Sequence, residues 1–212
     1  NKSTLANPQF KDERNPNLLQ TFDYIVMNPP FSYKSWMDGM NITVKGDVAT
    51  EPFGRFDGYK VPPEKNGDYA WFLHVLRSLK SAGKAAIILP HGVLFRGSSE
   101  ADIRKEIIDR GYIKGIIGLP ANLFFGTGIP ACIIVIDKED APDRKGIFII
   151  DASKGFIKDG NKNRLREQDI HKIVTVFNSQ IELNKYSRFV PNDEIKTINE
   201  YNLNIPHYID SS

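Results

Sequence analysis

The stretch FDYIVMNPPF, which runs from Phe22 to Phe31, is the strongest indication of fold in this sequence. Its first six residues are mostly apolar and rich in aromatic and β-branched types, which is typical of a short strand buried inside a parallel sheet. Pro29 and Pro30 have no backbone N–H group to donate, so the strand must end before them. In open α/β sheets, ligands bind beyond the carboxyl ends of the strands. The stretch therefore predicts an α/β protein with Asn28 to Phe31 at its ligand-binding edge.

Further along the chain, helical and strand patterns alternate. After a long segment over residues 32–67 that contains many Gly and Pro residues, Asp68 is predicted to cap a helix that ends at Gly83. A capping box at Ser99 predicts a second helix, which ends before Gly111. Strands are predicted over residues 85–89, 112–117, 131–136 and 147–150, and a third helix over residues 167–178. This alternation predicts a βαβ-type sheet to which the later strands are added in antiparallel direction.

The composition fits one globular domain and excludes several other classes of protein. Of the 212 residues 41% are hydrophobic, which is enough for a sizeable core and too many for a disordered chain. The formal net charge of +2 excludes a histone-like polycation. A single cysteine excludes an intrachain disulfide and a cysteine-rich zinc site, and no other metal site is predicted. No apolar run reaches the ~18–20 residues that cross a bilayer, so we expect a cytoplasmic protein.

The tetrapeptide Asn28-Pro29-Pro30-Phe31 has the groups needed to hold a planar amino group. The side-chain amide oxygen of Asn28 and the carbonyl oxygen of Pro29 are acceptors, and the stiff prolines would direct both toward one point. The ring of Phe31 offers a face on which a base can stack, worth about 1–3 kcal/mol. Two acceptors on an exocyclic amine would make its nitrogen more nucleophilic toward an electrophilic methyl group, without a metal ion. The alternative is a simple strand-ending turn with Phe31 in the core.

This tetrapeptide is similar to the (Asp/Asn/Ser)-Pro-Pro-(Tyr/Phe/Trp) motif of amino methyltransferases that depend on S-adenosylmethionine. Nearly the whole chain also resembles the modification subunit of type I restriction-modification systems, an adenine-N6 DNA methyltransferase. The segments that carry the resemblance are Thr4–Phe10, Phe22–Phe31, Ala85–Gly97, Gly118–Val135, Asp151–Lys154, Asn163–Leu165 and Tyr201–Pro206. It implies a fold that is part of a Rossmann-like methyltransferase sheet, with S-adenosylmethionine as the cofactor.

The resemblance also implies roles for the residues of the motif. Asn28 and Pro29 would bind the N6 amino group of an adenine that is flipped out of the duplex, and Phe31 would stack on that base. Asn28 and Pro30 would also lie near the methyl-donor end of the cofactor. These four residues are therefore the predicted catalytic group.

The cofactor half of the expected site is incomplete in this sequence. Ser3 and Leu5 match a family segment that contacts the adenine of the cofactor, although Ser3 stands where the family often has Asp or Asn. The family's glycine-rich cofactor loop and the acidic residue after the second strand are absent, and both are expected upstream of Asn1. Residues 1–150 are accordingly interpreted as the later part of a catalytic domain, and residues 151–212 as a C-terminal continuation that contacts DNA or another subunit. We expect the chain alone to be inactive.

Basic residues in two segments are candidates for contacts with DNA phosphates. Arg55 and Lys60 lie in the long segment after the motif, beside the expected position of the flipped base. Lys158 and Arg164 lie in a second, strongly basic segment, for which an ordinary solvated loop is the alternative. The partners implied by the resemblance are double-stranded DNA, a specificity subunit and a restriction subunit, with two modification subunits per complex.

Two other functions stay open from the sequence. The same motif also serves methyltransferases that act on RNA bases or on protein glutamine. A third hypothesis is a non-catalytic assembly module that docks a specificity subunit. The long segment after Phe31 and the extent of the resemblance favour a DNA adenine methyltransferase over both.

Overall fold

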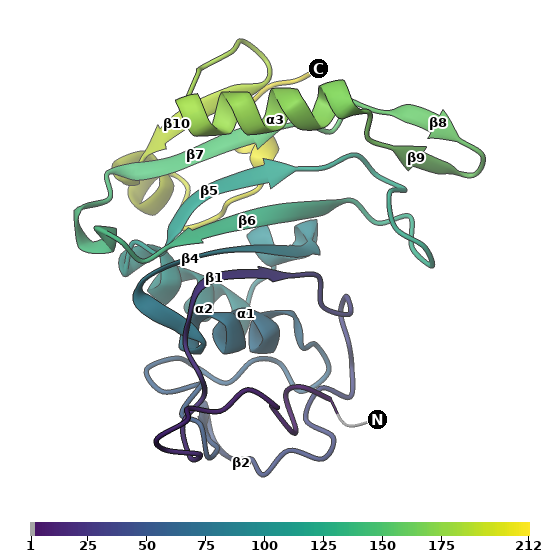
Figure 1. Ribbon diagram of the computed structural model, residues 1–212. Helices are drawn as coiled ribbons and strands as arrows, with labels where there is room; N and C mark the ends of the chain where they lie inside the picture. Colours follow the sequence, from purple (N-terminus) through teal and green to yellow (C-terminus); the bar gives the residue numbers. More distant parts are fainter. Residues whose placement is uncertain (1–2) are drawn as a thin grey trace.

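The computed structural model describes residues 3–212 and has a six-stranded mixed sheet at its centre (Figure 1). The strands lie in the order β1 (Phe22–Met27), β4 (Leu79–Pro90), β6 (Ala131–Asp137), β5 (Ile113–Gly118), β7 (Gly146–Asp151) and β10 (Ser187–Pro191). β1 is parallel to β4 and β5 is parallel to β7, whereas β6 is antiparallel to both β4 and β5. β10 forms one edge, antiparallel to β7, and β1 forms the other edge among the described residues. The predicted α/β class is confirmed.

Three α-helices within residues 3–212 cover the two faces of this sheet. α1 (Asp68–Arg77) and α2 (Ser99–Asp109) pack on one face, and α3 (Glu167–Ser179) packs on the other face over β5 and β7 (Figure 1). Successive residues of β7 belong alternately to two hydrophobic clusters, one on each face. Because side chains alternate between the faces of a strand, β7 is buried on both sides.

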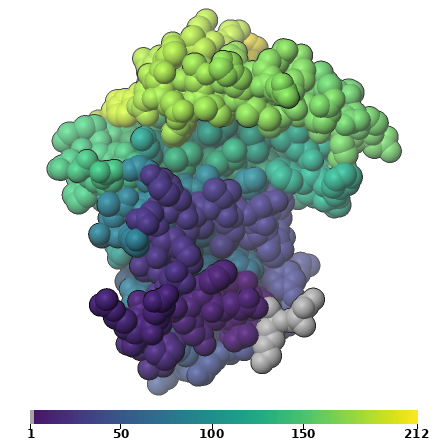
Figure 2. Space-filling model, in the orientation of Figure 1, coloured from purple at the N-terminus to yellow at the C-terminus, as the bar shows by residue number. Residues whose placement is uncertain are grey.

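Two short hairpins and several helical turns complete the described chain. They are β2 (Thr43–Lys45) with β3 (Val48–Thr50), β8 (Ile157–Asp159) with β9 (Lys162–Arg164), and the turns His91–Leu94, Ala141–Asp143, Glu194–Ile198 and Ile205–His207. The β2–β3 hairpin lies in the long segment 32–67, which also buries Trp36 and Phe56 in the core. With the N-terminal residues, this segment forms the lower end of the molecule in Figure 2. No helix in the described part of the chain combines the length and the apolar character needed to cross a membrane.

The first two helices differ from their predictions at their ends. α1 ends at Arg77, and Gly83, which was expected to end it, lies inside β4. A Cβ atom at Gly83 would lie 3.0 Å from the carbonyl oxygen of Phe22, so this glycine permits the close approach of β1 to β4. Asp68 lies in the first turn of α1 and not at the cap, because its side chain bonds to a distant segment. No side chain caps the start of α2, so the predicted capping box is wrong as well.

The direction of β7 also corrects the sequence analysis. β6 is antiparallel to its neighbours, as predicted, but β7 is parallel to β5. β6 and β7 follow one another in the sequence but are not neighbours in the sheet, because β5 lies between them. The chain leaves β6, passes β5, and begins β7 at the same end of the strands at which β6 finished. β7 is therefore antiparallel to β6 and parallel to the strand between them.

The end of the chain packs against the sheet. β10 extends the sheet beside β7, and Arg188 on β10 forms two hydrogen bonds to Glu194, at 2.8 and 2.6 Å. Apolar side chains further along join the main core, namely Ile195, Leu203, Ile205, Tyr208 and Ile209. Residues on both sides of position 150 thus share one sheet and one core.

Candidate functional site

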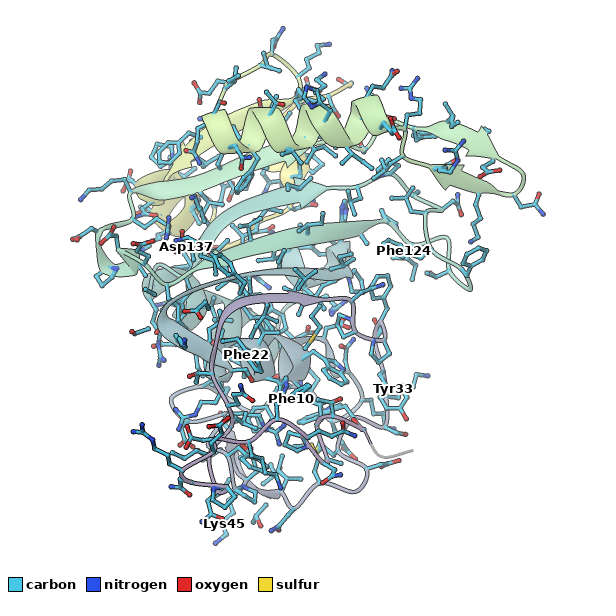
Figure 3. The ribbon with its side chains drawn as sticks, viewed as in Figure 1. Phe10, Phe22, Tyr33, Lys45, Phe124 and Asp137 are labelled. Atoms are coloured by element: carbon cyan, nitrogen blue, oxygen red, sulfur yellow. The ribbon has the colours of Figure 1, made fainter. Side chains whose placement is uncertain are left out.

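The motif Asn28–Phe31 lies directly after β1 and lines a pocket of about 500 Å³. The other wall of the pocket is formed by residues 124–127, which follow β5. The rings of Phe31 and Phe124 meet edge to face, with their centres 5.3 Å apart and their planes at 73°. Phe124 is labelled at this end of the sheet in Figure 3. Phe125, which also lines the pocket, is 95% exposed. The sequence therefore placed the motif correctly, at the carboxyl end of a strand.

The pocket offers hydrogen-bond acceptors and aromatic rings. Asn28 is exposed, and within residues 3–212 no side-chain hydrogen bond engages its amide. The other lining residues are proline, phenylalanine, glycine and threonine, so the described lining contains no ionisable side chain. Such a lining suits the binding of a planar, neutral group that carries N–H donors. What the described lining can contribute to chemistry is position and polarisation.

A buried carboxylate holds the turn that follows the motif. Ser32, the residue after Phe31, has a backbone φ of 47°, and its N–H group donates to Asp68 Oδ1 at 2.7 Å. Asp68 is 0% exposed, and its other oxygen accepts a hydrogen bond from Arg96 at 2.6 Å. Arg96 is held in turn by two hydrogen bonds to Glu100, at 2.8 and 2.9 Å. We call Asp68, Arg96 and Glu100 the motif network, because it fixes the backbone directly after the motif.

The facing wall belongs to a loop between β5 and β6, residues 121–130, which we call the aromatic loop. It has no regular secondary structure. Lys162 and Asn163 of β9 donate hydrogen bonds to backbone carbonyl groups of this loop. Both walls of the pocket are thus held from outside by polar contacts, the motif by α1 and the aromatic loop by the β8–β9 hairpin.

Arg55, which was predicted to contact DNA, lies in a second buried charge network. It is 3% exposed, and its guanidinium donates to Glu51 at 2.9 Å and to the carbonyl oxygen of Leu5 at 2.8 Å. It also lies 3.3 Å from Nδ1 of His74 in the last turn of α1. A guanidinium that is buried and paired in this way cannot reach a phosphate, so the prediction for Arg55 is wrong. We call Glu51, Arg55 and His74 the loop network.

The loop network has a defined charge state near neutral pH. Burial alone would raise the pKa of Glu51, but the hydrogen bonds and the charge of Arg55 outweigh burial and lower that pKa below its usual value. Burial and the Arg55 charge together lower the pKa of His74 to about 4. The network therefore consists of a carboxylate, a guanidinium and a neutral imidazole.

The predicted cofactor residues lie next to a second, mostly apolar hollow of about 300 Å³ that follows β1. Thr4 lines this hollow together with the exposed side chains of Tyr24 and Val26. Leu5 is fully buried in the core and is not part of the lining. The hydroxyl of Ser3 accepts a hydrogen bond from the backbone N–H of Leu5 at 3.2 Å. The segment 3–5 thus borders the hollow through Thr4 and not through the two residues that were predicted.

The other candidates for DNA contact, Lys60, Lys158 and Arg164, are exposed. Lys60 forms ion pairs with Asp102 of α2 at 2.8 Å and with Asp47 at 3.4 Å. Lys158 and Arg164 lie on the two strands of the β8–β9 hairpin. The structure therefore brings Lys158 and Arg164 onto the element that bonds to the aromatic loop, and it places Lys60 beside α2.

Other reactive groups lie outside the pocket lining. No three His, Cys, Asp or Glu side chains in residues 3–212 are grouped as they would be around a metal ion. Cys132 is buried in β6, and burial raises the pKa of its thiol. His91 follows β4 at the same sheet edge as the motif, and burial lowers its pKa, but it does not line the pocket.

The comparisons with known proteins agree with this geometry. Residues 1–212 match the protein family described as N-6 DNA Methylase. The chain belongs to this family. It is 35% identical over 190 residues to the type I restriction enzyme MpnII methylase subunit of Mycoplasma pneumoniae, a match that covers 90% of this chain and 34% of the relative. It is 34% identical over 203 residues to the MjaVII methylase subunit of Methanocaldococcus jannaschii, covering 92% of this chain and 34% of the relative.

One solved structure is also similar. The methyltransferase subunit of a type I restriction-modification system from Streptococcus thermophilus superposes with a TM-score of 0.79 and 37% identity. The match covers 99% of this chain and 42% of that protein. The chain spans about a third of the length of the curated relatives it matches.

Sequence reasoning missed several residues around the pocket of this member of the N-6 DNA methylase family. The signal for Phe124 and Phe125 was present: an aromatic pair follows the predicted strand 112–117, and parallel strands end at a common sheet edge. Asp68 carried the signal of a helix cap instead, because the sequence does not show which side chain a buried carboxylate meets. For Arg96 and Lys162 we find no local pattern that would have singled them out.

Proposed function

We infer that this chain forms the target-base side of an adenine-N6 DNA methyltransferase, within the modification subunit of a type I restriction-modification system. The observation that carries the proposal is the motif Asn28–Phe31 at the carboxyl end of β1, facing the rings of Phe124 and Phe125 across one pocket. Membership of the N-6 DNA methylase family supports the reaction and the class of substrate. The identities to type I methylase subunits support the system.

The residues of the motif would act by holding and polarising the target amine. The side-chain oxygen of Asn28 and the carbonyl oxygen of Pro29 accept hydrogen bonds from the two N6 hydrogens of a flipped adenine. Phe31 stacks on the base, which offsets part of the cost of a few kcal/mol for taking the base out of the duplex. Two acceptors on one nitrogen favour a lone pair that is directed at the methyl donor. Catalysis then comes from positioning and from fixed dipoles.

The hollow along β1 fits one side of S-adenosylmethionine. It has about 300 Å³ and a mostly apolar lining, near the lower end of the usual size of small-molecule pockets (about 300–1,000 Å³). Met27 lines it and directly precedes Asn28, so the hollow leads to the motif. When bound there, S-adenosylmethionine would supply the electrophilic methyl group. Thr4 and the exposed apolar side chains of β1 would cover one of its faces, with Ser3 and Leu5 supporting the segment around Thr4.

The DNA and protein partners follow from the same proposal. Lys158 and Arg164 on the β8–β9 hairpin would contact phosphates of double-stranded DNA beside the flipped base, and Lys60 would contact them from the long segment. A specificity subunit would select the site on the DNA, and a restriction subunit and a second modification subunit would complete the assembly in the cytoplasm. The division into residues 1–150 for catalysis and 151–212 for contacts is part of this proposal.

The substitution Asn28→Ala in the full-length modification subunit, assembled with its specificity subunit, tests the proposal. We expect methyl transfer from labelled S-adenosylmethionine to duplex DNA to fall about 100-fold or more, because a dipole aimed at the reacting centre is lost. Asn178→Ala is the matched control, since Asn178 is exposed on α3. Unchanged adenine methylation in Asn28→Ala would overturn the proposal. Methylation of RNA or of protein glutamine in place of duplex DNA would replace the substrate, and failure of the wild type to bind the cofactor would favour an assembly module.

A further inference from the structure

The aromatic loop, residues 121–130, has few hydrogen bonds of its own. Within the loop, the backbone N–H of Asn122 donates to the carbonyl of Gly128 at a long 3.4 Å. The N–H of Ile129 donates to the hydroxyl of Thr127 at 3.1 Å. Gly126 has a φ of 77°, which a residue with a side chain rarely adopts, and Phe125 is almost fully exposed. These internal contacts are too few to fix the conformation of an exposed loop.

Lys162 supplies the most direct external support. Its ammonium group donates to the carbonyl oxygen of Phe124 at 2.7 Å and to that of Thr127 at 3.1 Å. The two carbonyl groups lie on either side of Phe125 and Gly126, so one cation closes the tip of the loop. Hydrogen bonds from a charged donor are about twice as strong as those between neutral groups.

Asn163, the next residue on β9, holds the beginning of the loop. Its side-chain amide donates to the carbonyl oxygen of Ala121 at 2.7 Å, and its backbone N–H donates to that of Asn122 at 2.9 Å. Asn163 is buried, so both bonds are shielded from water. Two consecutive residues of β9 thus make four hydrogen bonds to the loop.

We propose that the β8–β9 hairpin is a positioning element for the target base, in which Lys162 and Asn163 preset the aromatic loop against Phe31. This inference rests on the function proposed above and deepens it. Lys162 does not line the pocket and does not touch the base. It acts through Phe124, whose ring meets that of Phe31 at the pocket, and through the exposed Phe125. A loop that is already in place when the base arrives avoids the cost of ordering it at that moment.

The same hairpin carries the exposed residues Lys158 and Arg164. Lys158 pairs with Asn163 across the hairpin, and Arg164 directly follows Asn163 on β9. A phosphate bound by either residue would therefore lie within a few residues of Lys162 and Asn163, which hold the loop. Contact with DNA beside the target would then stabilise the pocket that receives the base. The hairpin joins the two tasks because the residues for both are direct neighbours in one short element.

The test uses the full-length modification subunit with its specificity subunit and compares Lys162→Met, Lys162→Arg and Lys145→Met. Lys145→Met is the control, because Lys145 is exposed just before β7 and its side chain makes no hydrogen bond in the described structure. Hydrogen exchange of the amides in residues 121–130 reports on the loop without any need for activity. In Lys162→Met we expect this exchange to be about tenfold faster, with exchange in β5 and β6 unchanged.

Methylation kinetics then show whether the loop serves the reaction. In Lys162→Met we expect kcat on duplex DNA to fall about tenfold while the Kd for S-adenosylmethionine stays the same, and Lys162→Arg to restore most of the rate because it keeps a charged donor. Unchanged exchange in residues 121–130 overturns the inference whatever the methylation result. Faster exchange with an unchanged kcat overturns it too. Failure of the proposed function would be seen in a different experiment, because the Asn28→Ala variant would then be as active as the wild type.

If Lys162→Met does not assemble, Asn163→Ala gives a second route to the same comparison. It removes only the side-chain bond to Ala121 and keeps the backbone bond to Asn122. We expect a smaller rise in exchange that is confined to the start of the loop. A rise spread over the whole hairpin and sheet would mean that Asn163 stabilises the fold and not the loop, which contradicts its assignment as a positioning residue.

Discussion

Helix α1 contacts one buried carboxylate–arginine network at its start and another in its last turn. In the motif network, one oxygen of Asp68 accepts a hydrogen bond from the guanidinium of Arg96. The other oxygen accepts one from the backbone N–H group of Ser32. In the loop network, Arg55 meets a carboxylate four residues before it and the ring of His74. The two networks use the same chemistry and both bury their carboxylates, although the Arg96 side chain is 27% exposed and the Arg55 side chain only 2%.

The difference lies in what each network holds. The motif network ends on the backbone directly after Phe31, so its loss would displace the motif by changing the turn. The loop network ends on the carbonyl group of Leu5 and on Glu51, both outside the pocket lining. We therefore expect the first network to matter for the rate of methylation and the second to matter for the stability of the fold. The function of a buried ion pair follows from the group it holds and not from its residue types.

The largest effect is expected from Arg55→Met, measured as the free energy of unfolding. It leaves Glu51 buried without its cation, and such losses typically cost about 3–5 kcal/mol. Denaturant unfolding of the full-length subunit measures the loss, and kcat per folded molecule at saturating S-adenosylmethionine should stay the same. Arg77→Met is the control, because Arg77 is exposed and, within residues 3–212, its side chain donates only to the carbonyl group of Phe53. Normal stability together with weaker binding of DNA would show instead that Arg55 contacts DNA.

Arg55 also shows where sequence reasoning stops. A basic residue in a segment with many Gly and Pro residues has the pattern of an exposed loop, and that pattern led to the predicted DNA contact. Glu51, which pairs with Arg55, lies in the same segment, but the burial of the pair depends on Leu5 and on α1, which are distant in the sequence. Burial of a charge is a tertiary property, so no local pattern reveals it.

The motif was predictable for the opposite reason. The strand Phe22–Met27 and the prolines after it are local signals, and they place Asn28 at the sheet edge without knowledge of the rest of the fold. Gly83 is an intermediate case. Its position after an apolar helical pattern suggested a helix end, whereas its lack of a side chain serves the approach of two strands. The direction of β7 was missed because it depends on which strands are neighbours in the sheet.

A smaller effect, on activity, is expected from Asp68→Asn. The amide keeps an acceptor for the N–H group of Ser32 but loses the charge that holds Arg96, so the turn after the motif is less well fixed. We expect kcat to fall about 10-fold with little change in KM for S-adenosylmethionine, as for other losses of positioning in an active site. The control is Asp109→Asn, since Asp109 is also a carboxylate with several partners but lies at the end of α2. If Asp68→Asn lowers only the stability, the two networks do not differ in the way described above.

The smallest effect is expected from Ser32→Ala, and it shows which atoms transmit the contact. The hydroxyl of Ser32 lies 3.3 Å from Asp68 Oδ2, whereas its backbone N–H group lies 2.7 Å from Oδ1. The substitution removes the longer bond and keeps the shorter one, so kcat should fall less than about threefold. Ser35→Ala, at an exposed serine of the same segment, is the control. A loss as large as that of Asp68→Asn would mean that the hydroxyl holds the turn. The expected small loss would mean that Asp68 holds the backbone itself, and any residue that tolerates a positive φ could then follow Phe31.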